Sequence, residues 1–224
     1  MEAKAKRRVR DPAATRETIL DAASQLLARD GPEGVSLSAV AHLAGVNRGT
    51  AYQHFETREK LIEATIQWVS DKLFRAVFGD PETVGERQVE FVDVADLTDR
   101  LCDFAMDNPE ICRVWLQQVL AAPDPGKDPF WREYCGSLQR FANTKLAAPG
   151  IDAEVLSVVN LAGMFFWPIL VRAHAADDAQ RAELRRRFTQ EVLRLSMYGS
   201  MRAEAFPGVA ERLERGAVKP GKPV

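Results

Sequence analysis

Apolar residues recur at helical spacing along almost the whole chain. Between Ile19 and Leu27 they return every three or four positions, which predicts a helix that Thr15 can cap and Gly31 can end. A second stripe, from Leu61 to about Phe78, predicts a longer helix starting near Thr57. The sequence shows no strand with period-2 alternation, no internal repeat and no glycine-rich phosphate loop. We therefore expect an all-α fold.

Five further helices are predicted after the break at Gly79 and Pro81. Their approximate ranges are 89–107, 110–122, 129–147, 153–175 and 179–198. The segment 155–171 is apolar nearly all round, so it needs cover on every side. It is short for a membrane span and is interrupted by polar residues and Pro168, which favours a buried helix. The polar, proline-rich end of the chain predicts a flexible tail.

Two very short helices are predicted between Val35 and Phe55. Ser36 is a good N-cap for the first, and Asn47 is a good N-cap for the second. Gly45 lies between them, where a tight turn needs a positive φ. Two short helices joined by a turn of three or four residues that contains glycine form a helix-turn-helix.

The second short helix carries hydrogen-bonding side chains and no acidic residue. They are Arg48, Thr50, Tyr52, Gln53 and His54. In a major groove, arginine reads guanine and glutamine reads adenine, while hydroxyl groups suit phosphate oxygens. Arg58 and Lys60 add positive charge at the start of the following helix. These features predict a DNA-binding surface; the alternative is an ordinary solvated polar face.

Composition limits this interpretation in two ways. A net charge of −2 argues against a uniformly basic nucleic-acid binder, although the first ten residues hold five Lys or Arg against one Glu. Such a basic arm either meets phosphate or is a solvated terminus. Three cysteines (Cys102, Cys112 and Cys135), far from the three histidines, suggest neither a disulfide framework nor a metal site. We expect no metal, no cofactor, no signal peptide, no membrane association and a cytoplasmic location.

Three consecutive stretches resemble the DNA-binding domain of TetR/AcrR-type transcriptional regulators. They are "ILDAASQLLARDG", "GVSLSAVAHLAGVNRGTAYQHF" and "ETREKLIEA", within about 15–66. Ala51 departs from the family pattern, where a larger aliphatic residue is common, and Arg58 stands where lysine is usual. The resemblance implies DNA-backbone contacts by Thr50, Tyr52, His54 and Arg58, with Lys60 beside them. It implies base-edge contacts by Ser38, Asn47, Arg48 and Gln53, and a close backbone approach at Gly49.

The resemblance also implies how the chain is divided. We expect a basic arm (1–12), the helix-turn-helix domain (13–60), a connecting helix (61–78), a helical-bundle ligand-binding and dimerisation domain (79–202) and a flexible tail (203–224). The last two long helices are expected to pair across a two-fold axis, the alternative being a monomeric core. Large aromatic residues in the helices that line the cavity of relatives are candidate ligand contacts or plain core. They are Phe104, Trp115, Trp131, Phe165 and Phe166.

The expected function is that of a ligand-responsive repressor. A homodimer binds a palindromic double-stranded DNA operator and is released by a small apolar or aromatic effector. The alternatives are an activator with the same DNA-binding domain and an all-helical enzyme. The sequence offers the enzyme little, since it shows no Ser/His/Asp set, no paired-carboxylate motif and no metal-ligand spacing.

Overall fold

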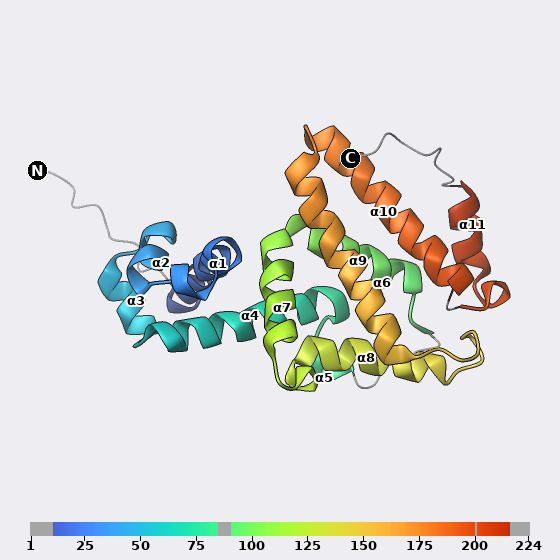
Figure 1. Ribbon diagram of the computed structural model, residues 1–224, viewed down its shortest axis with the longest axis horizontal. Coiled ribbons are helices and arrows are strands. Elements are labelled where there is room, and N and C mark those ends of the chain that lie inside the picture. The colour runs from blue at the N-terminus through green and yellow to red at the C-terminus, as the bar shows by residue number, and fades with distance from the viewer. Residues whose placement is uncertain (1–10, 85–90, 200, 216–224) are drawn as a thin grey trace, which may run out of the picture. The chain divides into compact units, whose positions relative to one another are not determined.

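The computed structural model describes residues 11–84, 91–199 and 201–215, and within these ranges the regular secondary structure is helical. Outside the helices, the described residues form one isolated antiparallel bridge, between Ala147 and Met201. The chain divides into two compact units, residues 1–69 and 70–224 (Figure 1). The expected all-α fold is confirmed. Most of the predicted basic arm lies outside the described residues.

The first unit contains the short helices that the sequence predicts. Its elements are α1 (Pro12–Asp30), a 3-10 turn η1 (Pro32–Gly34), α2 (Leu37–Leu43), α3 (Arg48–His54) and the first part of α4 (Arg58–Phe78). The cap of α1 differs from the prediction. The Asp11 carboxylate accepts from the Ala13 N–H at 3.0 Å, and Thr15 lies inside the helix with its hydroxyl donating to the Asp11 carbonyl. Pro12 suits the first helical position because its missing N–H would have no helical partner there.

A small core holds α1, α2 and α3 together. Ile19 of α1, Val40 of α2 and Ala51 of α3 are all fully buried. The Arg16 guanidinium lies 4.4 Å from the centre of the Phe55 ring and covers the end of α3. This packing holds α3 against the unit through its buried side, so that its polar side stays in solvent.

The second unit holds the helices that follow α4. They are α5 (Pro81–Val84), α6 (Val94–Asp107), α7 (Pro109–Ala121), η3 (Pro125–Lys127), α8 (Pro129–Ala142), α9 (Ala153–His174), α10 (Asp178–Gly199), η4 (Ala203–Ala205) and α11 (Pro207–Arg215). The α6 helix begins later than predicted because the Asp93 side chain caps it at the N–H groups of Ala95 and Asp96. The α8 helix ends at Ala142, five residues earlier than predicted, and Ala147 forms the bridge to Met201.

The predicted flexible tail is wrong for its first part, since residues 203–215 form η4 and α11. The Arg212 guanidinium donates to both carboxylate oxygens of Asp99, at 2.8 and 3.0 Å. Val209 and Ala210 pack against buried Leu193 and Met197 of α10. Apolar burial and a two-bond ion pair therefore keep this segment folded. Residues 216–224, the other part of the predicted tail, lie outside the described residues.

The α9 helix is the most apolar segment, and it is covered on one side only in this single chain. Leu161, Phe165 and Val171 are buried, and α9 packs against α6, α7, α8 and α10. Its length and composition would also suit a membrane span. The opposite side exposes a row of large apolar residues: Val155, Val158, Val159 and Phe166. Leu195 and Tyr198 of α10 are exposed as well.

Candidate nucleic-acid interface and internal cavity

The connection between α2 and α3 has the predicted geometry. The Ser36 hydroxyl accepts from the Ala39 N–H at 3.1 Å and caps α2. Gly45 has a φ of 63°, a value that residues with a side chain rarely adopt. Its N–H donates to the His42 carbonyl. The Val46 N–H donates to the Ala41 carbonyl at 3.0 Å, which closes the turn. These local bonds fix the direction in which α3 leaves the turn.

Asn47 is the N-cap of α3, as predicted. Its side-chain oxygen accepts from the Thr50 N–H at 2.7 Å and from the Thr50 hydroxyl at 3.0 Å. Gly49 keeps this cap uncrowded, because a Cβ there would lie 3.3 Å from the same oxygen. The sequence suggested two roles for Asn47, the cap of α3 and a contact with a base edge. In the structure its side-chain oxygen caps α3.

The outer side of α2 and α3 collects most of the predicted DNA-contacting residues. Ser38, Asn47, Arg48, Gly49, Tyr52 and Gln53 are exposed, while Thr50 and His54 are half-buried. Neither helix contains Asp or Glu. The surface can therefore approach phosphate oxygens without facing a carboxylate on either helix.

Arg48 and Tyr52 form a pair one turn apart on α3. The Arg48 guanidinium donates to the Tyr52 hydroxyl at 3.2 Å and lies 5.4 Å from the centre of its ring. Residues four positions apart on a helix are neighbours, and a cation is attracted to the face of an aromatic ring. The pair holds Arg48 along the helix surface, with guanidinium donors left over for a base edge or a phosphate.

Arg58 has a different environment from the one expected of a phosphate-binding cation. Its Nε donates to the Val35 carbonyl at 2.8 Å, and a terminal nitrogen donates to the Pro32 carbonyl. Glu33 and Glu59 lie 3.8 and 3.5 Å from its guanidinium. These contacts bind the start of α4 to the segment before α2, which gives Arg58 a structural role that the sequence analysis missed.

Lys60 also has an acidic neighbour. Its Nζ lies 2.7 Å from the Glu56 carboxylate, one helical turn away, and both side chains are exposed. The hydrogen bond with Lys60 lowers the pKa of the Glu56 carboxyl and raises the pKa of the Lys60 amine. Both groups are charged at neutral pH, and an exposed pair of this kind exchanges readily with solvent and with other anions.

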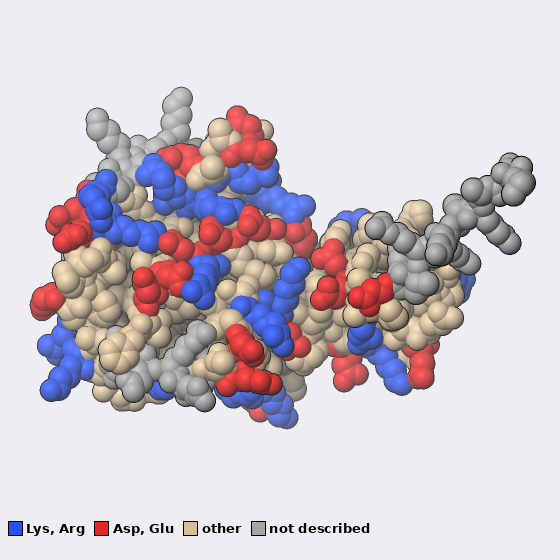
Figure 2. All heavy atoms as spheres, turned by 180° about the vertical axis from the view of Figure 1, so that it is seen from behind, with Lys and Arg blue, Asp and Glu red and all other residues tan. Residues whose placement is uncertain are grey.

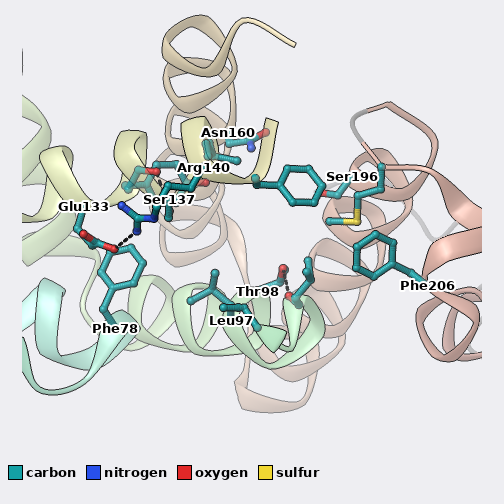
Figure 3. A pocket seen from close by; sticks show the side chains of 15 residues that line it. Phe78, Leu97, Thr98, Glu133, Ser137, Arg140, Asn160, Ser196 and Phe206 are labelled. Carbon is teal, nitrogen blue, oxygen red and sulfur yellow. Dashed lines mark hydrogen bonds and ion pairs between the residues drawn. The ribbon is translucent and has the colours of Figure 1, made fainter. Parts of the chain in front are cut away.

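The second unit contains a cavity of about 150 Å³ (Figure 3). Its lining residues come from the end of α4, from α6 and the residues just before it, from α8, α9 and α10, and from the segment after α10. They are Phe78, Val92, Val94, Leu97, Thr98, Glu133, Tyr134, Ser137, Leu138, Arg140, Phe141, Asn160, Ser196, Met201 and Phe206. One of them, Phe206, belongs to the segment 203–224 that was predicted to be a flexible tail, and Met201 lies just before that segment.

None of the five aromatic residues named from the sequence as candidate ligand contacts or plain core lines this cavity. Trp115 is buried in an aromatic cluster, with ring centres 5.2 Å from Phe130 and 5.3 Å from Phe165. Its indole N–H donates to the Asp128 carboxylate at 3.1 Å. Phe104 is buried, Trp131 is half-buried beside Trp115, and Phe166 is exposed. Helical spacing marks a buried face, and packed core and cavity lining share that spacing.

Charges on the second unit are mixed. Figure 2 shows Lys and Arg next to Asp and Glu over the visible face of this unit. Arg185, for example, pairs with both Asp103 and Asp107. This mixed face lacks the single sign of charge that attracts a phosphate backbone.

Comparisons with known proteins relate the first unit to bacterial regulatory proteins. Residues 19–65 match the family model described as bacterial regulatory proteins, tetR family. The nucleoid occlusion factor SlmA of Marinobacter nauticus is 29% identical over 110 residues, which cover 49% of this chain and 54% of that protein. An HTH-type transcriptional repressor of Mycobacterium tuberculosis is 33% identical over 73 residues, covering 32% of this chain and 39% of that protein. The chain thus spans about half the length of the first relative and less of the second.

A solved structure extends the likeness to both units. The TetR family protein CprB from S. coelicolor A3(2) matches with a TM-score of 0.61 and 22% identity, covering 91% of this chain and 98% of that chain. At this identity the match establishes a shared fold. The sequence matches are the stronger guide to what the first unit does.

Proposed function

The chain belongs to the tetR family of bacterial regulatory proteins, and we propose that it represses transcription by binding a palindromic DNA operator as a homodimer. The observation that carries the proposal is the polar outer side of α3. Asn47 caps this helix, Arg48 is its first residue, and it contains no acidic residue. Arginine in the first turn of a recognition helix is well placed to reach a base edge in the major groove. Regulators among the relatives, including one named as a repressor, favour this function over that of an enzyme.

The proposed dimer uses the exposed apolar sides of α9 and α10. Val155, Val159 and Phe166 lie on one side of α9, and Leu195 and Tyr198 extend the apolar surface on α10. Burying such a surface against a second copy removes it from water, and two helices from each copy make a four-helix arrangement. The dimer presents two recognition helices to successive major grooves, about 34–36 Å apart.

The proposed regulation uses the cavity in the second unit. A small apolar or aromatic effector binds there and favours a dimer whose recognition helices have a different spacing. The α4 helix runs from the first unit into the second, so it is the covalent connection through which the two sites are linked. Linkage requires that DNA lower the affinity for the effector by the same factor by which the effector lowers the affinity for DNA.

Selection of bound fragments from genomic DNA tests the proposed function most directly. We expect enrichment of an inverted repeat with half-sites about one helical turn apart, protected as one footprint. The same fragment placed upstream of a reporter gene should lower expression when the protein is present, which separates a repressor from an activator. Recovery of no sequence above background would contradict the proposal.

A further inference from the structure

The cavity of the second unit has the size of a single ring. Its volume is about 150 Å³. A cavity of roughly this volume, lined by apolar side chains, is known to hold one benzene molecule. The larger apolar residues around it include Phe78, Leu97, Phe141 and Phe206. An apolar body of about six heavy atoms therefore fills it, and a fused-ring or long-chain ligand does not fit without rearrangement.

Charge within the cavity is balanced by one ion pair. Arg140 lies 2.5 Å from the Glu133 carboxylate, and the side chains of Glu133 and Arg140 are 20% and 49% exposed. Figure 3 shows both beside Ser137 on one side of the cavity, with Phe206 on the opposite side. An anionic ligand at Arg140 would lie beside the more buried Glu133 carboxylate, which repels it and already neutralises the charge of the guanidinium. The pair therefore selects against a charged ligand.

Apart from the Arg140 guanidinium, two polar groups of the lining already donate their protons to backbone carbonyls. The Thr98 hydroxyl donates to the Val94 carbonyl at 2.7 Å, and the Ser137 hydroxyl donates to the Tyr134 carbonyl at 2.9 Å. Each hydroxyl oxygen keeps lone pairs that can accept, and a carboxylate accepts several bonds. Beside the Arg140 guanidinium the lining thus offers acceptors, and the Glu133 carboxylate is the strongest of them.

Size, charge and hydrogen bonding together define a ligand class. We propose that the cavity binds a neutral, single-ring molecule that carries one hydrogen-bond donor, such as a phenol. The ring lies among the apolar side chains, and the hydroxyl donates to the Glu133 carboxylate while Arg140 keeps its bond to the same group. This inference rests on the proposed function, because it names the class of the effector that the repressor responds to.

Calorimetric titration of the full chain with three ring compounds tests the ligand class. The compounds are phenol, toluene, which matches phenol in size but lacks a donor, and benzoate, which is an anion. We expect phenol to bind at least about tenfold more tightly than either, the usual effect of one hydrogen bond to a charged group. Preference for benzoate would overturn the proposal in favour of an anion site at Arg140. Equal binding of phenol and toluene, or binding of none, would overturn it too.

Two variants test whether the ligand binds at the Glu133 carboxylate. Glu133→Gln keeps the shape of the side chain and removes its charge, so the preference for phenol over toluene should fall to within a few-fold while toluene binding is unchanged. Glu154→Gln, at an exposed glutamate of α9 that does not line the cavity, is the matched control and should keep the full preference. Circular dichroism confirms that each variant is folded. An unchanged preference in folded Glu133→Gln would overturn the assignment.

Operator release, measured separately, distinguishes this inference from the proposed function. If phenol binds as expected and does not release DNA, the ligand class stands and the effector part of the proposed function fails. If a different compound releases DNA and none of the three binds the cavity, the proposed function stands and the ligand class is wrong.

Discussion

The Nε of Arg58 donates to the Val35 carbonyl at 2.8 Å, across 23 residues of chain. Val35 is buried directly before the cap of α2, and Arg58 is the first residue of α4. Satisfying a part-buried carbonyl with a charged donor contributes more than a neutral hydrogen bond does. The helix-turn-helix is therefore held at both of its ends, by its own caps and by this arginine.

Replacing Arg58 by alanine should lower the free energy of unfolding by about 1–3 kcal/mol, because two carbonyl oxygens lose their charged donor. Lys60→Ala is the matched control, since its pair with Glu56 is exposed and its loss should leave the free energy of unfolding nearly unchanged. Urea unfolding measures both. If Arg58→Ala leaves stability unchanged and instead flattens the salt dependence of DNA binding, Arg58 is a phosphate contact and its structural role is wrong.

Trp115→Ala should destabilise the protein by about 3–5 kcal/mol, the usual cost of removing a large buried aromatic side chain. The change also removes the indole donor from Asp128, which caps α8 through the Trp131 N–H. Thermal unfolding with calorimetry measures the loss. The sequence alone allowed Trp115 to be a ligand contact. A stable Trp115→Ala protein with an altered response to ring compounds would restore that interpretation.

Phe166→Glu should convert the dimer to a monomer, because it places a charge on the exposed apolar side of α9. The Phe166 side chain is 65% exposed in the single chain, so the fold should tolerate the change. Light scattering at micromolar concentration gives the mass of each form. The control is Glu154→Gln, near the start of the same helix. Wild-type protein that is monomeric under these conditions would contradict the proposed interface.

Alkaline pH should lower the free energy of unfolding, because two weakly acidic side chains, Cys102 and Tyr134, are buried in the fold. Burial raises the pKa of the Cys102 thiol to about 11 and that of the Tyr134 hydroxyl to about 12. The unfolded chain loses these protons at lower pH than the folded protein, so their contribution to stability is complete below about pH 9 and falls as pH rises toward 11. The slope is at most about 1.4 kcal/mol per pH unit for each group. Urea unfolding at pH 8 to 10.5 measures it. Cys102→Ala should have a shallower slope, and a free energy of unfolding that rises over this range would contradict the burial effect.

Local signals in the sequence predicted the helix-turn-helix well. Ser36, Gly45 and Asn47 act on groups within five residues of themselves, so their roles as caps and turn follow from residue type and position. Contacts between residues that are far apart along the chain have no comparable signal in the sequence. The bond from Arg58 to Val35 and the ion pair from Arg212 to Asp99, 113 residues apart, depend on how the helices pack.

The cavity was harder to predict for a related reason. Trp115 and Phe165 recur at helical spacing because they are buried, and the same spacing would hold for residues around a cavity. Phe206 lines the cavity from the segment that the sequence predicted to be a flexible tail, and Met201 lines it from just before that segment. Only the packing of α11 and of the residues just before it against α10 brings them there, and composition does not encode that packing.

Binding of the selected operator, and of versions with single base-pair changes, by wild-type and Arg48→Ala protein tests the central claim that α3 reads DNA. Fluorescence anisotropy gives each dissociation constant. The account predicts a loss of about 1–3 kcal/mol per half-site on the operator and relaxed preference at one base pair in each half-site, since arginine reads guanine through two acceptors. An Arg48→Ala protein that binds every site as tightly as wild type, with its preferences intact, would contradict it.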